Sequence, residues 1–158
     1  MRPPSGTGPL CYKSAMDLPA DFDKALELIL AEFHAQIGTI HVLEKDGMLH
    51  MRAHTKGIPE PVLAASRVIP IGKGIAGLAV ERKAPVNMCN LQTDKSGDAR
   101  PGAKATGAMG SLCVPILDGD RAIGALGIAA MGERNFTKDE EERLLAHGRA
   151  LAKTAAAS

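Results

Sequence analysis

The glycine run at Gly72–Gly77, with the sequence GKGIAG, is the segment whose residue types and spacing point most directly to chemistry. Its glycines match the G-x-G-x-x-G fingerprint that holds a dinucleotide pyrophosphate at a helix N-terminus. That chemistry needs a parallel strand within a βαβ unit, whereas the preceding segment carries Pro70 and no such repeat surrounds it. The run therefore predicts a tight turn into a helix whose free N–H groups face a pocket and could receive a carboxylate or phosphate.

Histidines and cysteines supply few further candidates for chemistry. His50 and His54 are four residues apart, and on the strand predicted there they lie roughly 13 Å from each other, too far to share one metal ion. Cys113 sits within an apolar segment, which favours a packed and inert thiol, and Cys89 is expected to be more exposed. Because no metal-ligand cluster and no nucleophile beside a base is evident, we expect no metal site, no catalytic residues and no enzymatic activity.

His41 lies in an apolar segment and shares one strand face with Thr39 and Leu43. Two hypotheses stay open for this residue. It is either a buried structural histidine that makes one hydrogen bond, or a side chain that lines a pocket.

The composition narrows the choice of partners and compartment. The chain has 158 residues, a formal net charge of +1 and only 3% aromatic residues, which indicates one domain and argues against a nucleic-acid partner. Its longest apolar stretch, Ala122–Met131, is about half of the ~20 residues that a membrane span needs. The N-terminus lacks the apolar run of a signal peptide, and three cysteines form no disulfide framework, so we expect a cytoplasmic protein that does not associate with membranes.

The order of the predicted elements defines the fold class. We expect a flexible leader over residues 1–20, a domain over 21–153 and a tail over 154–158. The elements predicted in the domain are a helix over 21–35, a hairpin of strands 39–43 and 48–54, a short helix near 59–65, a helix after the glycine run, an edge strand at 85–89, a hairpin of strands 111–117 and 122–129, and a helix from a capping box at Thr137 and Glu140 to about 153.

Hairpins with segregated helices predict an α+β fold with an antiparallel sheet. Its central strands are apolar at nearly every position, so both faces of the sheet must be covered. We place the first and last helices on one face, and the short helices with the long loop of residues 90–110 on the other. This second cover is thin and rich in glycine, which is typical of a ligand pocket.

The combination of these segments resembles a GAF domain across residues 21–153. The resemblance rests on GTIHVL at Gly38–Leu43, IPIGKGIAG at Ile69–Gly77, LCVPI at Leu112–Ile116 and GALG at Gly124–Gly127. It implies a six-stranded antiparallel sheet with the terminal helices on one face, where such domains commonly form homodimers, and a small-molecule pocket on the other. The helix side chains expected to be buried are Leu26, Ile29, Leu30, Phe33, Leu144 and Leu151.

Two functions of the family can be compared with these residues. The cyclic-nucleotide signature of phosphodiesterases begins with an Asn-Lys pair, which this chain lacks. In the free methionine-(R)-sulfoxide reductases, a cysteine occupies the position that matches Ala76, and acidic residues occupy positions that match Ser111, Gly127 and Ala129. The resemblance therefore implies neither cyclic-nucleotide binding nor this reductase chemistry.

A pocket floor of such small side chains suits an uncharged or largely apolar ligand, oriented by a few polar groups. The candidate ligand-binding residues are Thr39, His41, Ile75, Ala76, Asn90, Gln92, Asp94, Ser111, Cys113, Gly127 and Ala129. We expect a sensory or signalling module without catalytic activity that binds an unidentified small molecule, and no cofactor can be named. The alternatives are a thiol-based redox enzyme related to the reductases and a purely structural dimerisation module.

Overall fold

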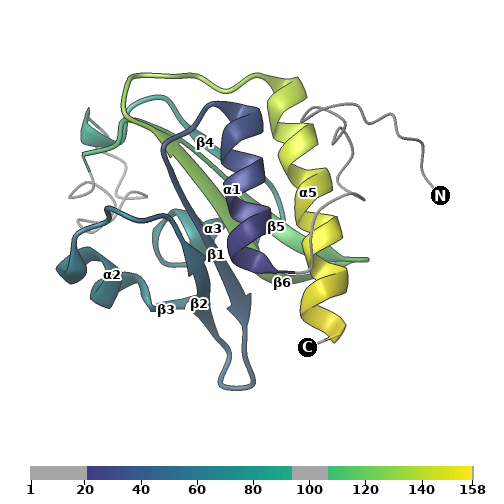
Figure 1. Cartoon of the computed structure of the whole chain (residues 1–158). Helices are drawn as coiled ribbons and strands as arrows, with labels where there is room; N and C mark the ends of the chain where they lie inside the picture. Colours follow the sequence, from purple (N-terminus) through teal and green to yellow (C-terminus); the bar gives the residue numbers. More distant parts are fainter. Residues whose placement is uncertain (1–20, 94–106, 158) are drawn as a thin grey trace.

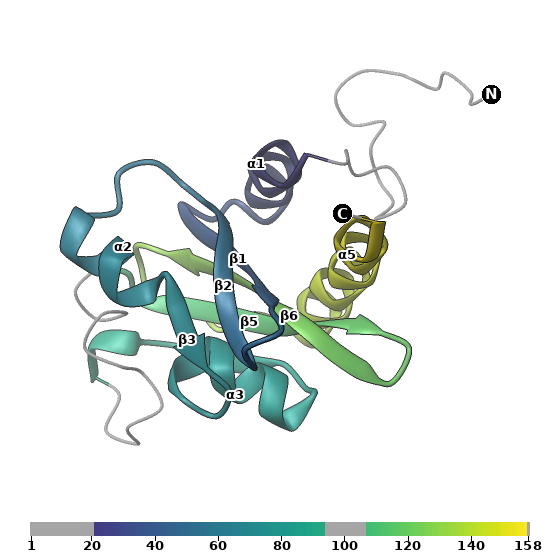
Figure 2. The ribbon, with the colours of Figure 1, turned by 90° about the horizontal axis from the view of Figure 1, so that it is seen from below.

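The computed structural model describes residues 21–93 and 107–157, which form a six-stranded antiparallel sheet with helices on both faces (Figure 1). The strand order is β3-β2-β1-β6-β5-β4. Seen along the sheet, α1 and α5 lie on one side of it, and α3 lies on the other (Figure 2). This arrangement confirms the predicted α+β class. The expected leader over residues 1–20 lies outside the described residues.

The first helix, α1 (Phe22–Phe33), begins where its sequence predicts. The carboxylate of Asp21 accepts a hydrogen bond from the backbone N–H of Asp23 at 2.8 Å, which caps the helix N-terminus. The helix ends at His34, whose backbone is left-handed with φ 52°.

The chain then forms one side of the sheet. β1 (Ile37–Leu43) and β2 (Met48–His54) are joined by a turn in which Gly47 has φ 81°, a value that favours glycine. α2 (Glu60–Ser66) follows, and β3 (Val68–Pro70) pairs with β2 at the sheet edge. The register between β1 and β2 shifts between Ile40 and His41, which marks a β-bulge directly before His41.

The helix α3 (Gly74–Arg82) follows β3 and leads to β4 (Val86–Met88). β4 lies at the opposite edge of the sheet from β3, and an edge position was expected for it. The 3-10 turn η3 (Leu91–Thr93) opens the predicted loop, and β5 (Gly110–Asp118) starts at its end. β6 (Arg121–Ala130) lies between β5 and β1, so the two long hairpin strands are central.

The last helix, α5 (Lys138–Ala157), extends beyond its expected end near residue 153. Its predicted capping box is present. The backbone N–H of Glu140 donates to Thr137 Oγ1 at 3.1 Å, and the backbone N–H of Thr137 donates to Glu140 Oε1 at 2.9 Å. Among the helices of the described part of the chain, none is both long enough and apolar enough to cross a membrane.

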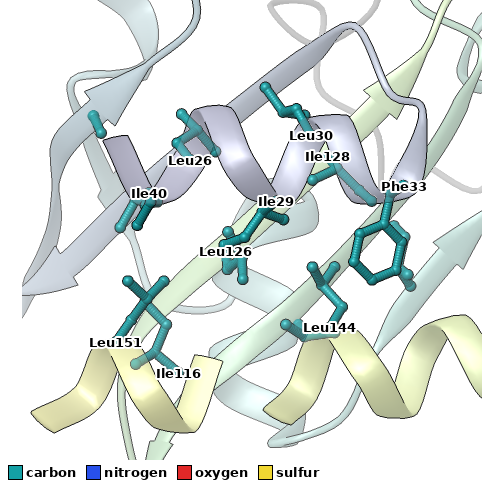
Figure 3. Packing of buried hydrophobic residues seen from close by; sticks show 14 of the residues in the cluster. Leu26, Ile29, Leu30, Phe33, Ile40, Ile116, Leu126, Ile128, Leu144 and Leu151 are labelled. Carbon is teal, nitrogen blue, oxygen red and sulfur yellow. The ribbon is translucent and has the colours of Figure 1, made fainter. Parts of the chain in front are cut away.

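The main core lies between the sheet and the two terminal helices (Figure 3). The six helix side chains expected to be buried are all buried there: Leu26, Ile29, Leu30, Phe33, Leu144 and Leu151. They pack against side chains of the chain's own sheet, including Ile40, Leu126 and Ile128. These contacts therefore stabilise the domain itself, and the expected homodimer stays a prediction.

The glycine run forms a tight turn that connects an antiparallel strand to a helix. The Gly72 N–H donates to the Gly77 carbonyl at 2.9 Å, and the Gly77 N–H donates to the Lys73 carbonyl at 3.1 Å. β3 pairs antiparallel with β2, so the turn lacks the parallel βαβ context of a dinucleotide site. A Cβ on Gly77 would lie 2.5 Å from the Pro70 carbonyl oxygen, which explains why glycine is needed there.

The substitution Gly77→Ala tests this close approach. Alanine gains about 0.5–1 kcal/mol of helix propensity, but its Cβ must displace backbone at Pro70. We expect a net loss of about 1–3 kcal/mol in the free energy of unfolding, measured by urea denaturation. The control is Gly132→Ala, because a Cβ at Gly132 meets nothing within 4 Å. Equal stability of both variants would contradict this account of the turn.

Candidate functional site

A cavity of about 350 Å³ lies between the sheet face opposite α1 and α5 and the segments that include α2 and the start of α3. Its floor is built from β1, β5 and β6, whose side chains alternate between the core and the cavity. Within the described residues that line it, no side chain is Asp, Glu, Lys or Arg. The cavity is therefore uncharged and of a size that suits a small metabolite.

The floor is a ladder of small residues across three strands. Cys113 on β5 is paired in register with Gly127 on β6, which is paired with Thr39 on β1. Two residues further along the same strands, Ser111 on β5 is paired with Ala129 on β6. A Cβ built on Gly127 would have only ordinary contacts, 3.5 Å from Cys113 Sγ and 3.6 Å from Thr39 Oγ1. The hollow exists because these positions carry almost no side-chain volume.

The roof comes from two short helical segments. Val62, Leu63 and Ser66 of α2 line the cavity, together with Ile75 and Ala76 from the first turn of α3. The expected position of the glycine turn beside the pocket is thus confirmed. The sequence placed this short helix over the pocket, but none of its side chains was named as a site residue. The available signal was the pair Val62-Leu63 directly after a proline-rich helix start, since apolar side chains there must pack on the sheet.

His41 joins the floor to the roof. Its side chain is 1% exposed and lines the cavity, and its Nε2 lies 2.8 Å from the Ser66 carbonyl oxygen. Because a carbonyl oxygen only accepts hydrogen bonds, Nε2 carries the proton and donates, and Nδ1 of the neutral ring is an acceptor. Both hypotheses for His41 therefore hold together: it is structural and it is part of the cavity wall.

Burial lowers the pKa of His41, because the charged imidazolium loses its hydration inside the protein. The hydrogen bond to Ser66 acts in the opposite direction, and the nearby His50 adds to the lowering. The ring is thus held in its neutral form.

Cys113 is the thiol of the cavity wall. Burial raises the pKa of its thiol to about 12, because the thiolate would be desolvated. Cys89, just beyond β4, is exposed. The predicted contrast between a buried and an exposed cysteine is confirmed.

The structure brings eight of the predicted site residues to the cavity: Thr39, His41, Ile75, Ala76, Ser111, Cys113, Gly127 and Ala129. Their role in binding stays a prediction. Two others lie elsewhere. Asn90 Nδ2 donates to Glu133 Oε2 at 2.7 Å, and Gln92 Nε2 donates to the Ala108 carbonyl at 2.8 Å. Asp94 lies outside the described residues.

Comparisons with known proteins agree with this architecture. A family model for the GAF domain matches residues 15–154. Comparison with curated proteins finds no match. Among solved structures, the GAF domain of an Acinetobacter phosphoenolpyruvate-protein phosphotransferase is similar at 18% identity with a TM-score of 0.72, covering 92% of this chain and 84% of that one.

Other similar structures are enzymes. A free methionine-R-sulfoxide reductase of Staphylococcus aureus, in complex with its substrate, is 27% identical with a TM-score of 0.60, covering 76% of this chain and 71% of that one. A type II enzyme of the same activity from Thermoplasma acidophilum is 20% identical with a TM-score of 0.69, covering 85% of this chain and 91% of that one.

These enzymes correct the expectation that the chain has no enzymatic activity, which was wrong. That expectation rested on the lack of a nucleophile beside a base in the sequence, and on the absence of one set of reductase residues, namely a cysteine at Ala76 and acids at Ser111, Gly127 and Ala129. Catalysis depends on a few side chains in a pocket rather than on the fold, and relatives this distant do not define which side chains take part. The cavity of this chain also holds a thiol of its own, at Cys113.

The lowered pKa of His41 predicts a pH dependence of stability. The unfolded chain binds a proton at His41 near the ordinary pKa of 6.5, and the folded chain does so only at lower pH. The contribution of His41 to the free energy of unfolding should therefore be constant above about pH 7. Below that it should fall, by up to about 1.4 kcal/mol per pH unit, until the pH reaches the folded pKa.

Urea denaturation at several pH values measures this dependence. His41→Gln keeps an N–H donor for Ser66 but does not titrate, so the slope between pH 7 and 5 should become smaller in this variant. An unchanged slope in His41→Gln would mean that other groups cause the effect.

Proposed function

Because this chain belongs to the GAF domain family, we propose that it binds a small, uncharged and largely apolar molecule. The observation that carries the proposal is the cavity of about 350 Å³ between sheet and roof, whose described lining has no charged side chain. Apolar ligand surface buried there contributes roughly 25 cal/mol per Å². A cationic ligand would lose its hydration without gaining a partner charge, and an anionic ligand would find only the backbone N–H groups at the start of α3, so a charged ligand is less favourable than a neutral one.

The same strands support a sensory role within this proposal. On β5, Ser111 and Cys113 face the cavity, whereas Leu112 and Val114 belong to the core under the terminal helices. A ligand that changes the packing on one face of β5 therefore acts on the elements that carry α1 and α5. This is a physical route from binding to the terminal helices, along which a signal could reach a partner.

The substitution Gly127→Val tests the binding proposal. Its side chain enters the cavity from the centre of the floor, and the first added atom has ordinary contact distances to Cys113 and Thr39. We expect ligand-observed NMR with a panel of uncharged aromatic and aliphatic fragments to detect binding to the wild-type chain. Binding to Gly127→Val should be at least about tenfold weaker, because valine occupies the ligand's volume.

Urea denaturation should find Gly127→Val within about 1 kcal/mol of the wild type, and Gly132→Ala serves as the control for a glycine replaced outside the cavity. Equal fragment binding by wild type and Gly127→Val would contradict the proposed site. A wild-type chain that binds no fragment of the panel would contradict the function itself.

A second candidate function is reduction of a small sulfoxide by Cys113. Its position in the cavity wall and the reductases among the similar structures favour this function. The Cys113 sulfur would take the sulfoxide oxygen, forming a sulfenic acid and releasing the sulfide. Two external thiols would then restore the Cys113 thiol, with release of water and a disulfide. The thiol pKa of about 12 disfavours the reactive thiolate, so binding is the first proposal.

A turnover assay with dithiothreitol and two substrates, free methionine-R-sulfoxide and the uncharged dimethyl sulfoxide, tests this second candidate. If Cys113 is the reducing thiol, Cys113→Ser should lower turnover to the uncatalysed rate. Cys89→Ser is the matched control and should keep turnover, because Cys89 is an exposed thiol that is not among the cavity-lining residues described above. Absence of turnover by the wild type would contradict the second candidate and leave the binding proposal as it stands.

A further inference from the structure

We infer that the cavity selects a ligand that donates a hydrogen bond, and that His41 Nδ1 is the atom that accepts it. The ligand class is an uncharged molecule with a hydroxyl or N–H group on an apolar body. This inference rests on the proposed binding function and specifies its substrate class.

The hydrogen bond to Ser66 determines which ring nitrogen of His41 carries the proton. Nε2 is 2.8 Å from the Ser66 carbonyl oxygen and must donate to it. A neutral imidazole has one N–H, so Nδ1 presents a lone pair. The position of the proton is therefore determined by the protein, and the nitrogen on the other side of the ring is left as a hydrogen-bond acceptor.

The acceptor atom Nδ1 of His41 has no hydrogen-bond partner within the described residues. Across the described residues, three buried side-chain atoms have no hydrogen-bond partner: His41 Nδ1, Asn87 Oδ1 and His147 Nδ1. Of these three residues, His41 is the one that lines the cavity. A buried acceptor without a partner is unfavourable, and a ligand that donates to it recovers the lost interaction once the groups that cover Nδ1 in the empty cavity move aside.

The His41 ring lies between strand β1 and the end of α2, beside the cavity. His41 comes directly after the register shift in β1, where a bulge alters the direction of side chains. Its hydrogen bond ends at Ser66, so the ring joins strand β1 to the end of α2, and both residues line the cavity. The hydroxyl groups of Thr39 and Ser111 lie on the same floor and offer further hydrogen bonds to a polar group of the ligand.

The lining also determines the charge of the donor. An ammonium or guanidinium group donates well, but the described lining contains no carboxylate to balance its charge. An ionised carboxylate has no hydrogen to donate, and an ionised phosphate would bring its charge into a described lining without a Lys or Arg side chain. The combination of an acceptor and an uncharged wall therefore favours neutral O–H and N–H donors.

Two pairs of probes of nearly equal shape test the inference on the wild-type chain. Indole carries an N–H where benzofuran carries an oxygen, and phenol carries an O–H where fluorobenzene carries a fluorine. We expect each donor to bind at least about tenfold more tightly than its partner probe. The readout is an NMR titration that also follows the ¹⁵N resonance of His41 Nδ1. This resonance should move toward its hydrogen-bonded value with the donors alone.

The variant His41→Phe keeps a ring and removes both nitrogens, so the preference for indole and phenol should disappear. His54→Phe is the matched control on the exposed side of β2 and should keep the preference. If His41→Phe does not fold, the Nδ1 resonance of the wild type decides alone.

Equal binding of donor and partner probe to the wild type, or an unmoved Nδ1 resonance, would overturn the inference while small-molecule binding stands. If none of the four probes bound, the proposed function and this inference would both be overturned.

Discussion

The central strands β1, β6 and β5 are buried on both faces, and this constraint governs the rest of the structure. Seven consecutive residues of β5, from Gly110 to Ile116, are buried. A strand of this kind leaves no face for solvent, so both sides of the sheet need a cover. The terminal helices supply one cover, and α2 with α3 supplies the other (Figure 2).

The two faces of these strands differ in side-chain volume. Toward α1 and α5, β5 presents Leu112, Val114 and Ile116, and the result is a closely packed core (Figure 3). Toward the other side, the same hairpin presents Ser111, Cys113 and Gly127. Because side chains alternate along a strand, one stretch of sequence encodes both a filled face and a hollow one. The cavity follows from this alternation.

The cavity has few polar side chains, and the chemical properties of these side chains depend on tertiary contacts. His41 acquires its donor role at Nε2 only because Ser66, 25 residues later in the chain, ends α2 directly over it. Cys113 becomes a poor nucleophile through burial beneath the same roof. The chain is similar in fold both to the GAF domain of a phosphotransferase and to a reductase, and in such a fold a few side chains in the pocket decide the activity.

Much of the fold could be predicted from the sequence, because local physics determines it. The Asp21 cap, the Asp46-Gly47 turn and the Thr137–Glu140 capping box depend on neighbours within four residues, whereas Ser111, Gly127 and Ala129 were named through the resemblance to the reductases. The GAF resemblance added the strand count and the side of the pocket.

Tertiary structure alone decided what the cavity contains. The helix α2 was expected over the pocket, but only packing gave His41 its carbonyl partner at Ser66, whereas Asn90 and Gln92 form hydrogen bonds with Glu133 and Ala108. The expectation of no enzymatic activity was wrong for a related reason. It rested on residues that the sequence lacks, and such a comparison does not show which side chains the folded chain brings together in a pocket. Periodicity reports which face a residue occupies, but contacts between segments distant in sequence arise only when the chain packs.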